Sequence, residues 1–251
     1  MNAFNFLGAK PATGKTMMLD KGLGLHAVDD LLATAGTHIS FAKFGWGTAA
    51  TMDAELIKAK TAKYRAAGII PYPGGTLLEV ATAAGKLPEF FAEAKELGFT
   101  GIEVSDGSTQ VGPTTRANVI QQARAAGFYV ISEVGKKNPE LDHDLSTAER
   151  RKMIQADLDN GAHYVILEAR EAGKNIGIYD ADGNIIGSEL DALAAIGVDK
   201  LIIEAPLKSQ QVALILKYGP NINLGNIAWD EVTALETLRR GLRGDTVGKI
   251  E

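Results

Sequence analysis

The sequence contains no cysteine, no long hydrophobic run and no surplus of basic residues. Without cysteine, the chain has neither disulfides nor thiolate metal ligands, and a cysteine nucleophile is excluded. No apolar run approaches the roughly 18–20 residues of a membrane-spanning helix, and residues 1–6 lack the basic and apolar regions of a secretory signal. The formal net charge of −5 argues against nucleic acid or an anionic lipid surface as a partner. We therefore expect a cytoplasmic protein without a membrane or nucleic-acid partner.

Hydrophobic residues make up 45% and charged residues 23% of the chain, which is typical of a globular domain with a large core. Glycine is in excess, because 28 of the 251 residues are glycine, about 11% against an average near 7%. Eight glycines follow predicted helices, where a left-handed residue commonly ends the helix. They are Gly36, Gly68, Gly98, Gly127, Gly161, Gly197, Gly219 and Gly241.

Short apolar or β-branched segments alternate along the chain with segments of helical periodicity. The predicted strands cover residues 16–19, 39–44, 69–72, 101–104, 129–134, 164–168, 201–204 and 221–227. The predicted helices cover residues 27–35, 54–67, 76–97, 114–126, 147–160, 188–195, 209–217 and 230–239. Eight such pairs in about 250 residues predict a single-domain (β/α)₈ TIM barrel over residues 1–251, with an open doubly wound sheet as the alternative.

Charged residues stand where the predicted strands end. The carboxylates are Glu103, Glu133, Glu168 and Glu204, and the cations are Lys43, Lys137, Arg170 and Lys208. Since the carboxyl ends of barrel strands meet on one rim, the four glutamates repel one another unless cations stand among them. A divalent cation with oxygen ligands, typically Mg²⁺, would supply the remaining positive charge. The pattern indicates a metal-assisted site for an anionic substrate.

Barrel enzymes often bind phosphate after strands seven and eight. The residues at these positions are Lys208, Ser209, Gln210 and Asn226, which we take as candidate substrate-binding residues. Ordinary helix capping explains Ser209 and Asn226 equally well.

Two other functions stay open at this point. His26, His38, His143 and His163 share no recognisable spacing with a serine and an acid, so a serine triad is not indicated. A lysine on the rim could instead form a Schiff base with a carbonyl substrate, as in class I aldolases. A barrel that only binds a ligand or protects against stress is the third possibility, although a scaffold has no need for a charged rim.

Eight segments, in order along almost the whole chain, together resemble the (2R)-phospho-3-sulfolactate synthase family. They are LDKG (19–22), FAKFGWGT (41–48), YPGGT (72–76), IEVSDG (102–107), SEVGKK (132–137), LEARE (167–171), EAPLKSQQ (204–211) and LETLRRGLRGDT (235–246). The resemblance implies a Mg²⁺-dependent (β/α)₈ barrel that adds sulfite to phosphoenolpyruvate in coenzyme M biosynthesis.

The resemblance also implies residue roles. Lys137 matches the lysine to which the family assigns protonation of C2, and it stands just past strand five. We expect Lys43, Arg170 and Lys208 to hold the phosphate and sulfite groups, and the four glutamates to place Mg²⁺ directly or through water. We also expect a homo-oligomer.

Overall fold

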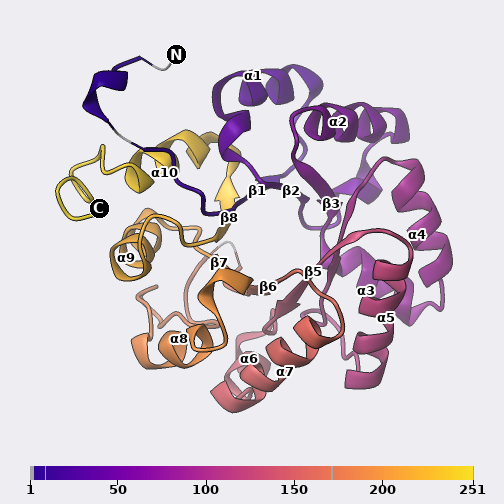
Figure 1. The fold of residues 1–251 in the computed structure, drawn as a ribbon. Helices are drawn as coiled ribbons and strands as arrows, with labels where there is room; N and C mark the ends of the chain where they lie inside the picture. The colour runs from indigo at the N-terminus through magenta and orange to yellow at the C-terminus, as the bar shows by residue number, and fades with distance from the viewer. Residues whose placement is uncertain (1–2, 9, 171, 251) are drawn as a thin grey trace.

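The computed structural model describes residues 3–8, 10–170 and 172–250. Its centre is one parallel eight-stranded sheet in the order β3-β2-β1-β8-β7-β6-β5-β4, surrounded by helices (Figure 1). The strands are β1 (Thr16–Asp20), β2 (Phe41–Phe44), β3 (Ile70–Pro73), β4 (Gly101–Val104), β5 (Tyr129–Val134), β6 (Tyr164–Leu167), β7 (Leu201–Glu204) and β8 (Leu224–Ala228). The predicted (β/α)₈ barrel is confirmed, and every predicted strand is present within a few residues of its expected bounds.

Ten α-helices lie in the described part of the chain. They are α1 (Leu25–Ala35), α2 (Ala54–Ala66), α3 (Gly75–Ala83), α4 (Leu87–Glu96), α5 (Pro113–Ala125), α6 (Pro139–His143), α7 (Thr147–Asp159), α8 (Gly187–Ala194), α9 (Lys208–Tyr218) and α10 (Val232–Arg239). Short 3₁₀ turns cover Asn5–Leu7, Gly36–His38, Thr48–Thr51, Val198–Lys200 and Trp229–Glu231. None of the helices in the described ranges is long and apolar enough to cross a membrane.

The barrel closes between β3 and β4 with little hydrogen bonding. The N–H of Ile70 in β3 donates to the carbonyl of Ser40, the residue before β2. Successive residues of a strand direct their backbone groups to opposite sides, so those of Pro71 and Pro73 point toward β4. Proline has no N–H to donate, and one bond, from Thr100 N to Pro71 O at 3.2 Å, joins the two sides. Gly101 completes the seam, because a Cβ there would lie 2.9 Å from the Ile70 side chain.

Two local predictions were wrong. The predicted helix 76–97 is two helices, α3 and α4, because Gly85 adopts a left-handed φ of 69° and turns the chain between them. Gly36 was expected to end its helix in a left-handed conformation. Its φ is −55° instead, and it continues into a 3₁₀ turn.

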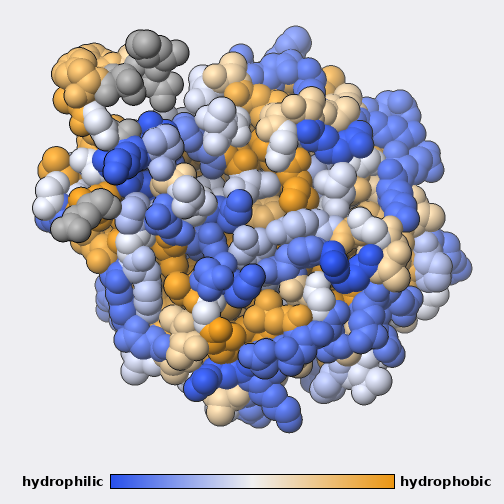
Figure 2. Space-filling view, in the orientation of Figure 1, coloured by the Kyte–Doolittle hydropathy of each residue, from blue (hydrophilic) through white to orange (hydrophobic). Residues whose placement is uncertain are grey.

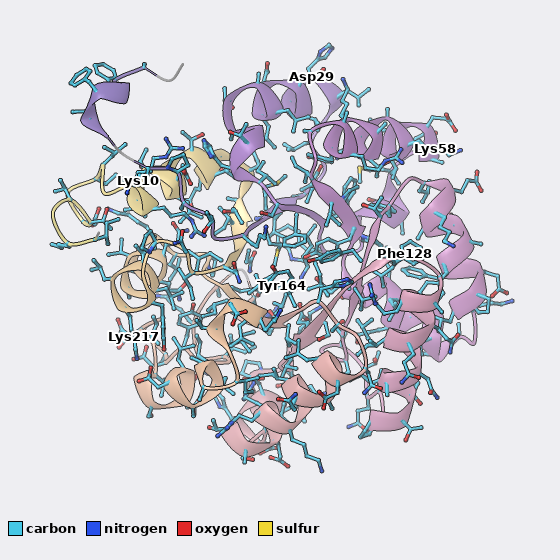
Figure 3. The ribbon with its side chains drawn as sticks, in the orientation of Figure 1. Lys10, Asp29, Lys58, Phe128, Tyr164 and Lys217 are labelled. Atoms are coloured by element: carbon cyan, nitrogen blue, oxygen red, sulfur yellow. The ribbon has the colours of Figure 1, made fainter. Side chains whose placement is uncertain are left out.

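The barrel interior is layered by the two-residue period of the strands. One buried layer contains Met17, Phe41, Tyr72, Ile131, Ile166 and Ile202. Two residues further along their strands, nearer the carboxyl ends, come Lys43, Glu133, Glu168 and Glu204. Tyr164 packs against the apolar layer and lies toward the barrel axis (Figure 3). Lys58 and Lys217, by contrast, lie on the outer helices (Figure 3). The fold therefore sets a charged layer on top of an apolar floor.

The N-terminal turn stands apart from this core. Phe4 and Phe6 are 72% and 84% exposed. Figure 2 shows this segment as an orange projection at the upper left of the molecule. The barrel does not cover the apolar side chains of this N-terminal turn.

Candidate active site

A pocket of about 150 Å³ opens at the carboxyl end of the barrel. All eight strands or the residues directly after them contribute to its lining, which consists of Leu19, Lys43, Gly45, Trp46, Gly74, Gly75, Thr76, Glu103, Lys137, Glu168, Arg170, Glu204 and Asn226. This is the end at which barrel enzymes place their chemistry. The small volume and the charged lining suit a small anion.

Lys43 lies at the centre of the charged layer. Its Nζ is 2.9 Å from Glu103 Oε2, 3.1 Å from Glu133 Oε2 and 3.7 Å from Glu204 Oε1. Burial acts to lower the pKa of Lys43, but the three carboxylates outweigh burial and raise the pKa well above its usual value. Lys43 is therefore a permanent ammonium, which binds anions and neutralises carboxylates but is a poor Schiff-base nucleophile.

The four glutamates differ in how readily they ionise. Burial opposes ionisation of Glu133, yet Lys43 and Lys137 hold its pKa at about 2. Burial raises the pKa of Glu103 to about 7, against the opposing effect of Lys43. Burial and the neighbouring carboxylate of Glu133 raise the pKa of both Glu168 and Glu204. Glu133 is thus the ionised member of a group in which its neighbours resist losing their protons.

One oxygen of the Glu133 carboxylate has no hydrogen-bond donor, although Lys43 donates to the other oxygen. The oxygen without a donor, Oε1, is buried. A proton on Glu168 supplies one partner, because the carboxyls of Glu168 and Glu133 are within hydrogen-bonding reach of each other. A metal ion bound by these two carboxyls would supply another. In the described ranges, no three or more acidic or histidine side chains are spaced as a metal cage.

Lys137 faces the same carboxylates from the loop after β5. Its Nζ donates a hydrogen bond of 2.9 Å to Thr76 Oγ1 at the start of α3. Burial lowers the pKa of Lys137, but Glu133, Glu168 and Glu103 outweigh burial and Lys43, so the pKa is raised. From the sequence alone it was open whether the glutamates raise the pKa of Lys137 or Arg170 and a neighbouring Mg²⁺ lower it. The structure brings Lys137 into the pocket as a protonated ammonium held by a hydroxyl.

Arg170 and Asn226 are held by backbone contacts. The N–H of Arg170 bonds to Glu168 Oε1 at 2.6 Å, and its guanidinium donates to the carbonyl of Lys137 at 3.0 Å. Asn226 donates from Nδ2 to the carbonyl of Arg170 at 2.6 Å. Glu204 joins them by accepting from Ala169 N–H at 2.9 Å. These bonds fix the ends of β6, β7 and β8 relative to one another.

Backbone strain is concentrated at the pocket. Five non-glycine residues of the described chain have positive φ, and three of these, Trp46, Arg170 and Asn226, line the pocket. Such conformations cost free energy and cluster at functional sites, where surrounding contacts enforce them.

The other candidate phosphate ligands lie elsewhere. Lys208 is about half exposed and pairs with Asp245 at 2.7 Å, and Ser209 is exposed at the start of α9. Gln210 is buried, but its Nε2 donates to the carbonyls of Gly173 and Gly183 and so secures the long loop after β6. Among the four residues proposed for this region, the pocket lining includes Asn226 alone.

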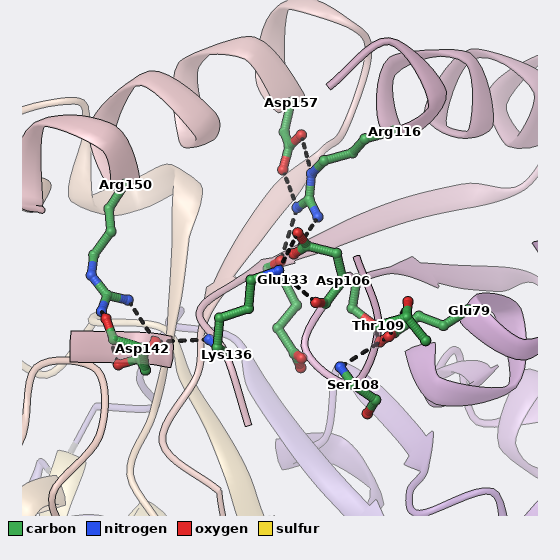
Figure 4. Close-up of polar contacts among 11 residues, drawn as sticks. Glu79, Asp106, Ser108, Thr109, Arg116, Glu133, Lys136, Asp142, Arg150 and Asp157 are labelled. Carbon is green, nitrogen blue, oxygen red and sulfur yellow. Dashed lines mark hydrogen bonds and ion pairs between the residues drawn. The ribbon is translucent and has the colours of Figure 1, made fainter. Parts of the chain in front are cut away.

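A second layer of ion pairs supports Glu133 from outside the barrel (Figure 4). Arg116 on α5 donates 2.8 Å hydrogen bonds to Asp157 Oδ1 and to the backbone carbonyl of Glu133. It also reaches Asp106 at 3.2 Å. The sequence analysis missed Arg116 and Asp157, because 41 residues separate them and each resembles an ordinary charge on a helix.

The loops after β4 and β5 are tied by the same layer. Lys136 donates from Nζ to Asp106 and from its backbone N–H to Asp142, the latter at 2.7 Å. Asp142 also accepts from Arg150 at 2.8 Å (Figure 4). Lys136 therefore points away from the pocket and braces the loop that carries Lys137.

Comparison with known proteins identifies the family of this chain. A family model described as (2R)-phospho-3-sulfolactate synthase matches residues 8–245. The phosphosulfolactate synthase of Methanocaldococcus jannaschii is 51% identical over 251 residues and covers 100% of both chains. That of Bacillus subtilis is 38% identical over 236 residues, covering 93% of this chain and 92% of its own.

Solved structures support the fold alone. A 3-hexulose-6-phosphate synthase superposes with a TM-score of 0.53 at 16% identity, covering 90% of this chain and 98% of its own. A phosphonopyruvate hydrolase in complex with oxalate and Mg²⁺ has a TM-score of 0.57 at 15% identity, covering 88% and 77%. On the full-length sequence matches, the chain belongs to the (2R)-phospho-3-sulfolactate synthase family.

Proposed function

We propose that this protein adds sulfite to C3 of phosphoenolpyruvate and protonates C2, giving (2R)-phospho-3-sulfolactate. The observation that carries the proposal is the pair of ammonium groups, Lys43 and Lys137, that face the buried carboxyls of one small pocket. Full-length identity to curated phosphosulfolactate synthases supports it.

The chemistry requires charge stabilisation and one proton. Sulfite is a good nucleophile near neutral pH, so its sulfur forms the bond to C3 without a protein base. The π electrons of the C2–C3 bond then move toward the carboxylate, and Lys137 donates its proton to C2. Lys137 regains a proton from solvent, and the phosphate ester stays intact.

The remaining residues bind and orient. Thr76 accepts from the Lys137 ammonium and so directs it, while Lys43 and Arg170 supply positive charge for the anionic groups of the two substrates. Glu103 accepts the Gly75 N–H at 2.7 Å and fixes the start of α3 beside them. A Cβ at Gly75 would lie 2.1 Å from Ser105 Oγ, so only glycine allows this close approach.

Mg²⁺ belongs to the proposal as a cofactor. Glu133 and Glu168 would hold it together with water and substrate oxygens, because Glu133 Oε1 has no hydrogen-bond donor and the Glu168 carboxyl lies beside it. When bound, Mg²⁺ supplies Lewis-acid stabilisation of the substrate carboxylate. Direct coordination by Glu103 and Glu204 stays a prediction; both contact Lys43, as Glu133 does.

The decisive experiment is a product assay. With phosphoenolpyruvate, sulfite and Mg²⁺, phosphorus NMR should show conversion to a new phosphate ester without inorganic phosphate. EDTA should abolish turnover, and added Mg²⁺ should restore it. Absence of phosphoenolpyruvate consumption would refute the synthase, and activity in EDTA with an adduct trapped by borohydride would establish the Schiff-base alternative.

A homo-oligomer and a cytoplasmic location also belong to the proposal. The exposed Phe4 and Phe6 side chains are the feature that favours burial against a further subunit. Sedimentation of the full chain tests this, and a monomer at micromolar concentration contradicts it.

A further inference from the structure

The loop after β2 forms a tight turn with an unusual residue in it. The Thr48 N–H bonds to the Gly45 carbonyl at 3.1 Å, and the two central residues, Trp46 and Gly47, have φ values of 56° and 69°. Two positive φ values are the mark of a type I′ turn, whose central positions are dominated by glycine, asparagine and aspartate. Tryptophan at the first of them is strained, and asparagine or glycine would hold the same turn more readily.

The strained residue stands at the mouth of the pocket. Trp46 lines the pocket, yet it is 53% exposed. The ammonium of Lys21, from the loop after β1, lies 4.4 Å from the centre of its ring. This cation–π contact attaches the indole to a second strand end and adds positive charge beside the opening.

We propose that Trp46 is a substrate-covering residue, whose indole packs over phosphoenolpyruvate in the pocket while Lys21 holds it in place. The inference rests on the proposed function, since it takes phosphoenolpyruvate as the occupant. A large apolar ring at this opening excludes water, and the attraction between Lys43, Arg170 and the anionic substrate grows stronger as water leaves. This role explains why a turn that favours asparagine carries a half-exposed tryptophan.

Tryptophan fluorescence can report directly whether the Trp46 indole packs over bound phosphoenolpyruvate. The chain has two tryptophans, and Trp229, at the start of a 3₁₀ turn after β8, does not line the pocket. Trp229→Phe thus leaves Trp46 as the sole indole emitter. We expect phosphoenolpyruvate with Mg²⁺, without sulfite, to change the emission of this variant in a saturable way. In Trp46→Phe, where Trp229 is the emitter, the same titration should leave the emission unchanged.

The KM for phosphoenolpyruvate and the melting temperature together distinguish a substrate-covering role of Trp46 from a structural role. Trp46→Asn relieves the turn, so its melting temperature should equal or exceed that of the parent. Its KM for phosphoenolpyruvate should nevertheless rise roughly tenfold or more, as expected when a closing element is lost. Trp46→Phe keeps a ring and should recover much of that loss, and Trp229→Phe should match the parent.

Each outcome decides between the two proposals. Binding heat with phosphoenolpyruvate but no change in Trp46 emission, together with an unaltered KM in Trp46→Asn, overturns the cover alone. A lower melting temperature of Trp46→Asn, with the same loss of activity in Trp46→Phe, assigns Trp46 a structural role and also overturns it. Neither binding heat nor turnover with the parent protein overturns the proposed function and the cover together.

Discussion

The ammonium of Lys137 and the hydroxyl of Thr76 meet at 2.9 Å, joining the loop after β5 to the first turn of α3 across the pocket. The two residues are 61 positions apart in the chain. Their contact aims a proton donor at the space that the substrate would occupy. The same contact makes the role of Lys137 testable through two residues.

Lys137→Ala should lower kcat by about 10²–10⁴-fold, the usual loss for a general acid, while calorimetry with phosphoenolpyruvate shows binding largely intact. Thr76→Val removes only the directing hydroxyl and should lower kcat less. Lys58→Ala, at an exposed ion pair on α2, is the control. If Lys137→Ala raised KM and left kcat near normal, Lys137 would be a substrate clamp and the acid would have to be another group.

Glu103→Gln should alter the pH dependence of stability. Burial raises the pKa of Glu103 from 4.5 to about 7. A carboxyl with a higher pKa in the folded than in the unfolded state loses stability as the pH rises from about 4.5 to about 7. The variant lacks this titration, so its free energy of unfolding should fall less between pH 5 and pH 8, by on the order of 2–3 kcal/mol. Urea unfolding at both pH values measures this, with exposed Glu55→Gln as the control. Parallel pH curves for variant and parent would contradict it.

Arg116→Met should destabilise the protein strongly. The change leaves Asp157 buried without its partner and removes a donor from the Glu133 carbonyl. Loss of one member of a buried ion pair typically costs about 3–5 kcal/mol. Arg151→Ala, on the exposed face of α7, should change the free energy of unfolding by less than about 0.5 kcal/mol. Denaturant unfolding compares them, and similar midpoints would show that Arg116 contributes little.

Arg170 and Lys208 should differ in their effect on substrate binding. Arg170 lines the pocket, whereas Lys208 pairs with Asp245 on the surface. Arg170→Ala should therefore raise the KM for phosphoenolpyruvate by about 10- to 150-fold, because a charge-assisted contact contributes about 1.5–3 kcal/mol. Lys208→Ala should leave KM within about twofold, since an exposed ion pair contributes little. Steady-state kinetics decide, and the reverse order would return the phosphate site to the start of α9.

Sequence reasoning found the strands and the glutamates for the same reason. A strand is a local pattern, and a carboxylate directly after or within a buried β-branched run signals an opening at that end. Glu103, Glu133, Glu168 and Glu204 were identified from such positions, and the structure brings all four together around one pocket. The division of residues 76–97 into two helices depended on Gly85, whose signal was weaker than the helical periodicity around it.

Only the tertiary structure decided which charges meet. Lys43 could have pointed to any neighbouring strand end, and barrel closure places it against glutamates that are 60, 90 and 161 residues further along the chain. In the closed barrel, Lys208 and Gln210 do not line the pocket, although both follow a strand that contributes to it. The sequence by itself determined the eight strand–helix units and the residue types on the rim, because these depend on local periodicity. The pairing, burial and protonation of those residues depend on contacts between distant segments, which exist only once the barrel has closed.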